Sequence, residues 1–142
     1  MTQDDEGLLD SKIVIIDDDP SSVDLLSLML EDDDYTNVIS FTGAFEGLDY
    51  CLENPVDLIL LDIQMPEING IGVLEKLDAK LHEEFLPVIV LTAHAGEEVQ
   101  EKALKSGAHD FLTKPFKQNE VLLRIKNVLT TRKYYKLAVK PI

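Results

Sequence analysis

The stretch VDLILLDIQMPEING, residues Val56–Gly70, decides the fold of this chain. Its apolar run LILL (58–61) is too continuous for a strand with one face in water. It predicts a central strand of a parallel sheet that is covered on both faces. Asp62 follows directly, and ligands bind at the carboxyl ends of parallel strands, so we expect its carboxylate to face a cleft. Met65-Pro66 then ends the extended segment.

Length and composition favour one domain. A chain of 142 residues with 45% hydrophobic content can bury a single core. The single cysteine, Cys51, excludes an internal disulfide and a cysteine-based metal cluster, and its apolar helical context predicts a buried, inert thiol. The N-terminus has no signal-peptide pattern, and no apolar run approaches the length of a membrane helix. We therefore expect a cytoplasmic protein without membrane contact.

The net charge of -14 is unevenly distributed. Residues 1–120 contain all 27 acidic residues and 7 of the 13 basic ones, whereas residues 121–142 contain 6 basic residues and no acidic one. The acidic body predicts repulsion of nucleic acid, and we expect no direct nucleic-acid binding by this chain. We interpret residues 1–10 as a flexible acidic leader. Residues 132–142 are expected to form a basic helical extension, which is either a solvated helix end or a linker to another module.

Apolar runs and helical periodicities alternate along the rest of the chain. Strands are predicted over residues 12–16, 38–41, 56–62, 87–91 and 110–113, and helices over 20–30, 43–52, 70–81, 97–106 and from 118. Asp19 before Pro20 is expected to cap the first helix, and the brief strand at 38–41 is expected near a sheet edge. This pattern predicts an α/β fold: a doubly wound parallel sheet of five strands between layers of helices.

The residues that follow the predicted strands form one candidate site. They are Asp17, Asp18, Asp62, Thr92 and Lys114. Clustered carboxylates need a cation, and a small set of hard oxygen ligands suits Mg²⁺. A lysine and a hydroxyl at the same place can bind a phosphoryl group, and a carboxylate can accept one as an acyl phosphate. Taken singly, each residue also fits a helix cap or a surface position, so the prediction depends on their coincidence at one sheet edge.

Four motifs in this order resemble the receiver domain of two-component response regulators across residues 11–131: IVIIDDDP (13–20), LILLDIQMPEINGIG (58–72), VIVLTAHA (88–95) and FLTKPF (111–116). The resemblance implies a flavodoxin-like three-layer sandwich with strand order 2-1-3-4-5. It implies Asp62 as the phosphoacceptor. The implied Mg²⁺ ligands are Asp17, Asp18, Asp62 and the main-chain carbonyl of Gln64, with Mn²⁺ as a substitute metal.

The same resemblance assigns roles around the phosphoacceptor. Thr92 and Phe111 correspond to the switch residues, and Lys114 corresponds to the lysine that pairs with the phosphate, followed by a cis peptide to Pro115. The modulating positions are Gln64, Ala93 and His94: Gln64 and His94 correspond to positions that tune the lifetime of the phosphoryl group, and the small Ala93 leaves room for a partner or the phosphoryl group. The implied donor is a sensor histidine kinase or a histidine phosphotransfer protein. Output to an effector or a downstream domain, or a homodimer, would use residues 97–106, 110–113 and the helix from 118.

Two other classes of protein remain as alternatives. A receiver-like module that mediates contacts without phosphorylation usually lacks one of the acids, the threonine or the lysine, and all are present here. Phosphatases that form an aspartyl phosphate place a second Asp two residues after the nucleophile, as a general acid. Gln64 occupies that position, so we expect a switch with slow self-dephosphorylation and no turnover enzyme.

Overall fold

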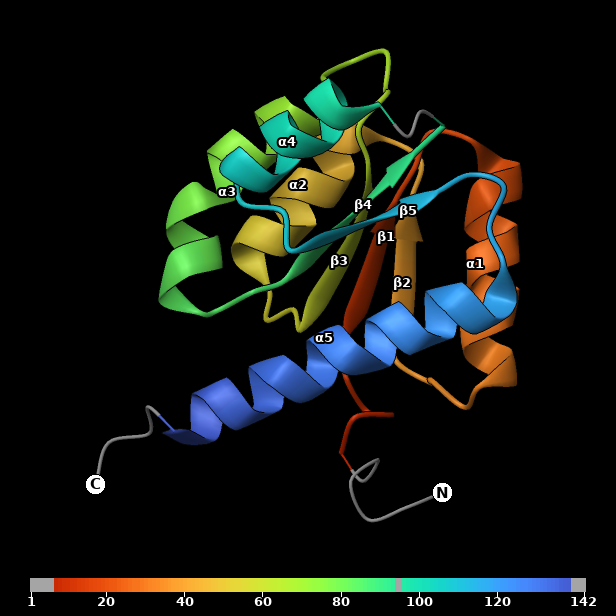
Figure 1. Cartoon of the computed structure of the whole chain (residues 1–142), viewed down its shortest axis with the longest axis vertical. Coiled ribbons are helices and arrows are strands. Elements are labelled where there is room, and N and C mark those ends of the chain that lie inside the picture. Colours follow the sequence, from red (N-terminus) through yellow and green to blue (C-terminus); the bar gives the residue numbers. More distant parts are fainter. Residues whose placement is uncertain (1–6, 94–95, 139–142) are drawn as a thin grey trace.

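The computed structural model describes residues 7–93 and 96–138, which form a parallel sheet between two layers of helices (Figure 1). The strands are β1 (Ile13–Ile16), β2 (Val38–Phe41), β3 (Leu58–Asp62), β4 (Val88–Thr92) and β5 (Asp110–Thr113). The helices are α1 (Pro20–Asp32), α2 (Ala44–Glu53), α3 (Gly70–Glu83), α4 (Glu97–Lys105) and α5 (Gln118–Ala138). The sheet order is β2-β1-β3-β4-β5, so the predicted fold class, strand order and edge position of β2 are confirmed.

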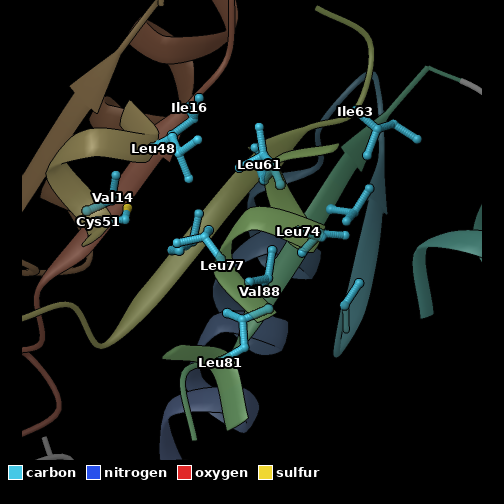
Figure 2. Close-up of a cluster of buried hydrophobic side chains, with 14 of the residues drawn as sticks. Val14, Ile16, Leu48, Cys51, Leu61, Ile63, Leu74, Leu77, Leu81 and Val88 are labelled. Atoms are coloured by element: carbon cyan, nitrogen blue, oxygen red, sulfur yellow. The ribbon is translucent and has the colours of Figure 1, made fainter. Parts of the chain in front are cut away.

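The central strands are buried on both faces, as the run at 58–61 predicts. Every residue of β1, β3 and β4 is buried, and alternate side chains enter two separate cores. One core lies against α2, α3 and α4 and contains, among others, Val14, Leu61, Leu74, Leu77 and Val88 (Figure 2). The other lies against α1 and α5 and contains, among others, Ile13, Ile15, Leu60, Leu26 and Ile125. Because both faces are covered, polar groups of these strands collect at the strand ends.

Capping residues fix where two helices next to the candidate site begin. Asp19 caps α1 by accepting a hydrogen bond from the N–H of Ser21 at 3.0 Å, and Pro20 is the first helical residue, as predicted. Asn69 caps α3 in the same way, with its Oδ1 accepting from the N–H of Gly72 at 2.9 Å. Both helices therefore start immediately after the loops that follow β1 and β3.

The C-terminal part of the predicted leader, residues 7–10, differs from expectation. Leu8 is 4% exposed and belongs to the core under α1 and α5, so residues 7–10 are not a solvated tail. The N–H of Ser11 donates to the carbonyl of Leu8, which closes this segment into a turn before β1. The burial of Leu8 was not predicted, because Leu8 and Leu9 are a single apolar pair between acidic residues and show no helical or strand periodicity. Residues 1–6 lie outside the described part of the chain.

The last helix is longer than the receiver boundary at residue 131 and continues to Ala138. Its buried stripe consists of Val121, Ile125 and Leu129, whereas Leu122, which the helical spacing of apolar residues also placed on this face, is only partly buried. Lys140-Pro141, where the proline predicts the end of this helix, lies outside the described residues. None of the helices described between residues 7 and 138 is long and apolar enough to span a membrane.

Cys51 lies in α2 and is buried, as predicted. Burial raises the pKa of its thiol to about 12, while the charge of Lys80 opposes this rise. A thiol with this pKa is protonated at neutral pH and is a poor nucleophile. The cysteine therefore contributes packing and no chemistry to the site described next.

Candidate functional site

Four neighbouring strands bring polar residues to one edge of the sheet. Asp17 follows β1, β3 ends at Asp62, β4 ends at Thr92, and Lys114 follows β5. These strands are adjacent in the order β1-β3-β4-β5, so the residues lie side by side along the carboxyl edge. The N–H of Lys114 also donates to the carbonyl of Thr92 at 2.8 Å, which continues the ladder past the end of β5. The parallel topology thus assembles the site at the edge where it was expected.

Three carboxylates form the acidic part of the site. Each of Asp17, Asp18 and Asp62 offers an oxygen atom, and these oxygens all lie within 4.8 Å of one another. Asp17 is 0% exposed and Asp62 is 3% exposed, whereas Asp18 is exposed to solvent. Carboxylates this close repel one another when ionised, and burial removes the water that would solvate them. The cluster therefore favours a bound cation or a bound proton.

Backbone amides orient the two buried carboxylates. Oδ1 of Asp17 accepts a hydrogen bond from the N–H of Asp19 at 2.9 Å, and Oδ1 of Asp62 accepts one from the N–H of Gln64 at 3.0 Å. The Oδ2 atoms face Lys114, whose Nζ lies 3.0 Å from Asp17 and 3.6 Å from Asp62. Although close to Lys114, Oδ2 of Asp17 lacks hydrogen-bond geometry to any described partner, so we treat this contact as an ion pair.

The charges of the site shift one another's pKa values. Burial raises the pKa of Asp62 to about 7; the Gln64 hydrogen bond and Lys114 lower it, and Asp17 raises it further. Burial alone would lower the pKa of Lys114, but its contacts with Asp17 and Asp62 outweigh burial and raise the pKa. Lys114 is therefore a fixed positive charge at neutral pH. In the absence of a cation, Asp62 is the acid of the cluster that most readily holds a proton.

The donor set fits a hard divalent cation such as Mg²⁺. All three side chains offer carboxylate oxygens, and the buried Oδ2 of Asp17 has no hydrogen bond that a metal would have to displace. The exposed side chains of Asp18 and Gln64 leave one side of the cluster open to solvent. Mg²⁺ prefers a few carboxylate ligands and keeps several water molecules, which this open side admits. Asp17, Asp18 and Asp62 are the side chains that would hold it.

The loop after Asp62 is held against the end of β3 by a close backbone contact. The N–H of Gly70 donates to the carbonyl of Ile63 at 3.0 Å. A Cβ atom at Gly70 would lie 2.6 Å from Cα of Ile63 and 2.8 Å from the carbonyl oxygen of Asp62. Only glycine fits here, because both neighbours are backbone atoms. The sequence marked Gly70 as a helix start and gave no indication of this contact with the acceptor residue.

Three of the predicted switch and modulating residues, Thr92, Ala93 and Gln64, lie at or just after the ends of β3 and β4. Thr92 is 1% exposed, whereas Ala93 and Gln64 are exposed beside it. His94 lies outside the described residues. The Lys114-Pro115 peptide is cis, as predicted.

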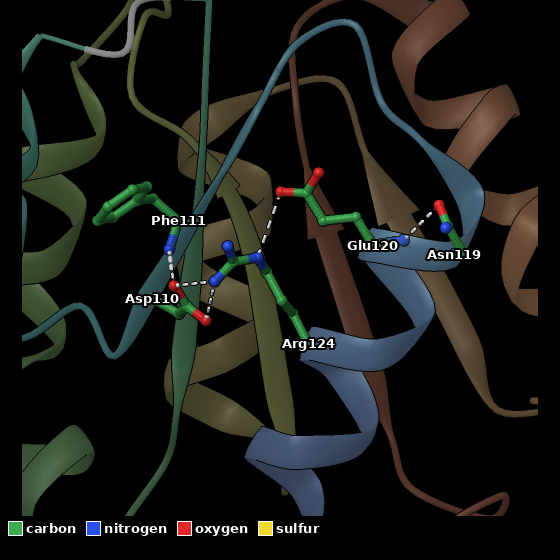
Figure 3. Close-up of polar contacts among 5 residues, drawn as sticks. All are labelled: Asp110, Phe111, Asn119, Glu120 and Arg124. Atoms are coloured by element: carbon green, nitrogen blue, oxygen red, sulfur yellow. Dashed lines mark hydrogen bonds and ion pairs between the residues drawn. The ribbon is translucent and has the colours of Figure 1, made fainter.

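Phe111 is partly buried in β5 and packs against the core formed with α2, α3 and α4. Figure 3 shows how its backbone is tied to α5. Oδ1 of Asp110 accepts from the N–H of Phe111 at 2.8 Å, and both oxygens of the same carboxylate accept from Nη1 of Arg124, at 2.9 and 2.8 Å. Glu120 completes this chain of contacts, 3.3 Å from Nε of Arg124. Sequence reasoning missed the Asp110–Arg124 pair because its partners lie on a strand and a helix, outside any local spacing rule.

The sequence matches the family described as "Response regulator receiver domain" over residues 13–126. This match includes every residue of the site described above. The chain belongs to this family. Its relatives include the response regulator SaeR of Staphylococcus aureus (strain USA300), 37% identical over 123 residues, and the signal transduction histidine-protein kinase BarA of Escherichia coli (strain K12), 35% identical over 125 residues. The alignments cover 87% and 86% of this receiver chain but only 52% of SaeR and 14% of BarA, so the chain spans part of these relatives.

Solved receiver structures agree with the fold. A CheY-like receiver domain protein from Methanospirillum hungatei JF-1 is 30% identical, with a TM-score of 0.80 over 89% of this chain and 98% of that one. The receiver domain of the sensor histidine kinase PA1611 from Pseudomonas aeruginosa PAO1 is 25% identical, with a TM-score of 0.76 over 84% of this chain and 98% of that one. That neighbour has a magnesium ion coordinated in its active site cleft.

Proposed function

We propose that this receiver domain is a phosphoacceptor in a two-component phosphorelay, with Asp62 as the acceptor and Mg²⁺ as its cofactor. The observation that carries the proposal is the setting of Asp62 at the end of β3. Its carboxylate is buried, clusters with those of Asp17 and Asp18, and lies 3.6 Å from Nζ of Lys114. A carboxylate fixed beside a lysine and next to acids that can bind a cation meets the needs of a phosphoryl acceptor, because both cations would offset the charge of the incoming group.

The proposed donor is a phosphohistidine on a sensor histidine kinase or a histidine phosphotransfer protein. A carboxylate oxygen of Asp62 forms a bond to phosphorus as the P–N bond to the imidazole breaks. The electron pair of that P–N bond stays on the imidazole nitrogen. Lys114 and the hydroxyl of Thr92 bind the oxygens of the transferred group. Asp17, Asp18, Asp62 and the main-chain carbonyl of Gln64 would hold Mg²⁺, with Mn²⁺ as a substitute metal. When bound, the metal would offset the negative charge of the acids and of the phosphoryl group.

The proposed output is a change of the surface formed by α4, β5 and α5. When Thr92 moves toward the phosphoryl group, Phe111 fills the space that it leaves. Asp110 and Arg124 then transmit the shift of β5 to α5, because they join the backbone of Phe111 to that helix. An effector, a downstream domain or a second copy of the chain would bind this surface. The cytoplasmic location expected from the sequence is part of the same proposal.

A turnover enzyme is not favoured by the residues near Asp62. Gln64 stands two residues after the acceptor, where an aspartyl-phosphate phosphatase has a general acid, and its side chain carries no dissociable proton. Without that acid, we expect the phosphoryl group to be lost slowly to water. A phosphorylation-independent interaction module is the second candidate, and the following experiment separates the two.

The test is intact-mass spectrometry after incubation with acetyl phosphate and Mg²⁺. We expect a single phosphoryl-sized mass increase in the wild-type chain and none in Asp62→Asn or in a metal-chelated sample. Far-UV circular dichroism would verify that the variant is folded. A folded wild-type chain that gains no mass would refute the proposal and favour the interaction module.

A further inference from the structure

The last turns of α5 lie at the opposite edge of the sheet from Asp62, across the N-terminal ends of the strands (Figure 1). Arg132 connects them to the body of the protein. Its side chain is 10% exposed and forms an ion pair with Asp57. Its Nε donates to the carbonyl of Phe85 at 3.2 Å, and its Nη2 lies 3.4 Å from the carbonyl of Glu84. A single guanidinium therefore contacts two separate segments of the chain.

Both segments lead directly into central strands. Asp57 precedes β3, and its Oδ2 accepts from the N–H of Lys12, the residue before β1, at 2.7 Å. Glu84 and Phe85 form the turn between α3 and β4. Arg132 is thus connected to the starts of β1, β3 and β4. These are the strands whose opposite ends carry the acidic residues and the threonine of the site.

The contacts of Phe85 with α5 provide a second observation. Its φ of 51° is the left-handed conformation that commonly follows a helix end, and the N–H of Leu86 donates to the carbonyl of Leu81 at 3.1 Å to close this cap of α3. Two contacts from α5 reach the cap: Arg132 binds the carbonyl of Phe85, and the ring of Tyr135 lies against its ring with 3.8 Å between centroids. The end of α5 and this turn therefore hold each other in place.

We propose that Arg132 is a clamp that fixes the end of α5 to the N-terminal edge of the sheet, so that α5 as far as Ala138 is a rigid arm of the receiver body. A flexible linker beginning at residue 132 is excluded by this proposal. A partner or a segment that binds the arm is then held at a fixed orientation to the sheet. The proposal does not depend on phosphorylation of Asp62, and its failure would leave that function untouched.

Electrostatics decides which variants test the clamp. Loss of Asp57 alone would leave the largely buried guanidinium of Arg132 without its counter-ion, which would lower stability for a reason unrelated to the arm. The double variant Arg132→Ala/Asp57→Asn removes both charges, and the asparagine oxygen can still accept from the N–H of Lys12, so the variant releases the arm without creating an unpaired charge. Lys136→Ala is the matched control, because it removes an exposed positive charge from the same turns of α5. Alanine favours a helix at least as well as arginine or lysine, so no variant loses helix propensity.

The measurement is hydrogen–deuterium exchange of backbone amides in the full chain. In the wild-type chain and in Lys136→Ala, we expect residues 132–138 to be protected. In the double variant we expect exchange there to rise at least about tenfold, the effect of losing hydrogen bonds to a charged group, with residues 118–129 unchanged. Arg132→Lys keeps the charge but not the planar fork and should give an intermediate increase. Unprotected amides at 132–138 in the wild-type chain, or no change in the double variant, would overturn the proposal.

Discussion

Gly70→Ala adds one methyl group at the point where α3 begins against the acceptor residue. The new Cβ would lie 2.6 Å from Cα of Ile63 and 2.8 Å from the carbonyl oxygen of Asp62. Both atoms belong to the backbone at the end of β3, so no side-chain rotation can make room. The start of α3 and the end of β3 must move apart, and Asp62 must move with its own carbonyl.

The size of the effect follows from this contact. Overpacking of a well-packed site costs about 1–3 kcal/mol. Replacing glycine by alanine in a helix returns at most about 1 kcal/mol. We therefore expect the free energy of unfolding to fall by about 1–2 kcal/mol. Because a misplacement of about 1 Å can cost on the order of a hundredfold in rate, we also expect phosphorylation by acetyl phosphate to slow by roughly ten- to a hundredfold.

Gly72→Ala provides a matched control in the same turn of α3. Its Cβ would meet Cγ1 and Cδ1 of Ile68, at 2.8 and 2.9 Å, which belong to a flexible, partly buried side chain. Ile68 can rotate away, so we expect stability to be unchanged or raised by up to about 1 kcal/mol. The rate of phosphorylation should equal that of the wild-type chain.

Urea unfolding followed by circular dichroism gives the stabilities, and time-resolved intact-mass spectrometry gives the rates. The reasoning predicts that Gly70→Ala lowers both quantities and that Gly72→Ala lowers neither. Equal effects of the two substitutions, or a Gly70→Ala chain that is phosphorylated at the wild-type rate, would refute the role assigned to this close contact.

Three further predictions concern the charges and the core. In EDTA, the folded chain keeps a proton on Asp62 up to its pKa of about 7, which the unfolded chain releases near pH 4. Wild-type stability should therefore fall as the pH rises from about 4 to about 7, and Asp62→Asn should remove this fall. A pKa difference of about three between the folded and unfolded chains corresponds to about 4 kcal/mol, so the variant should be more stable by up to about 4 kcal/mol at pH 8. Parallel urea-unfolding profiles of the two chains would contradict this. Mg²⁺ at about 100 times its dissociation constant should stabilise the wild-type chain by about 2.7 kcal/mol, measured by thermal unfolding. Asp17→Asn should gain less at the same concentration, and an equal gain would argue against Asp17 as a ligand. Leu77→Ala, at a 0% exposed core position in α3, should cost about 3 kcal/mol in urea unfolding, and a loss below about 1 kcal/mol would show that the core repacks.

Much of the fold could be predicted because the apolar pattern of each segment agrees with its position in the sheet. The continuous run at 58–61 requires burial on both faces, and the structure provides it with helices on both sides of β3. Asp17, Asp62, Thr92 and Lys114 could be grouped before any coordinates existed, since each follows an apolar strand and parallel strands end at a common edge. The strand order itself came from resemblance to the receiver family, because periodicity does not specify which strands are neighbours.

The features that escaped prediction depend on contacts between distant segments. Asp57 and Arg132 are 75 residues apart, and each on its own is an ordinary charged residue near the end of an element. Leu8 is buried because it packs into the core under α1 and α5. The sequence predicted that Gly70 begins a helix. Its contact with Asp62 depends on the path of the loop between them, which the sequence does not specify. Such contacts carry no periodic signal in the sequence.

The central claim is that Asp62 itself accepts the phosphoryl group. The most direct measurement is reduction of the acetyl phosphate-treated chain with borohydride, which converts an aspartyl phosphate to homoserine, followed by peptide mapping. The account predicts homoserine at position 62, dependent on Mg²⁺ and absent when the donor is omitted. Homoserine at Asp17 or Asp18, or unmodified Asp62 in a chain that has gained the phosphoryl mass, would contradict it.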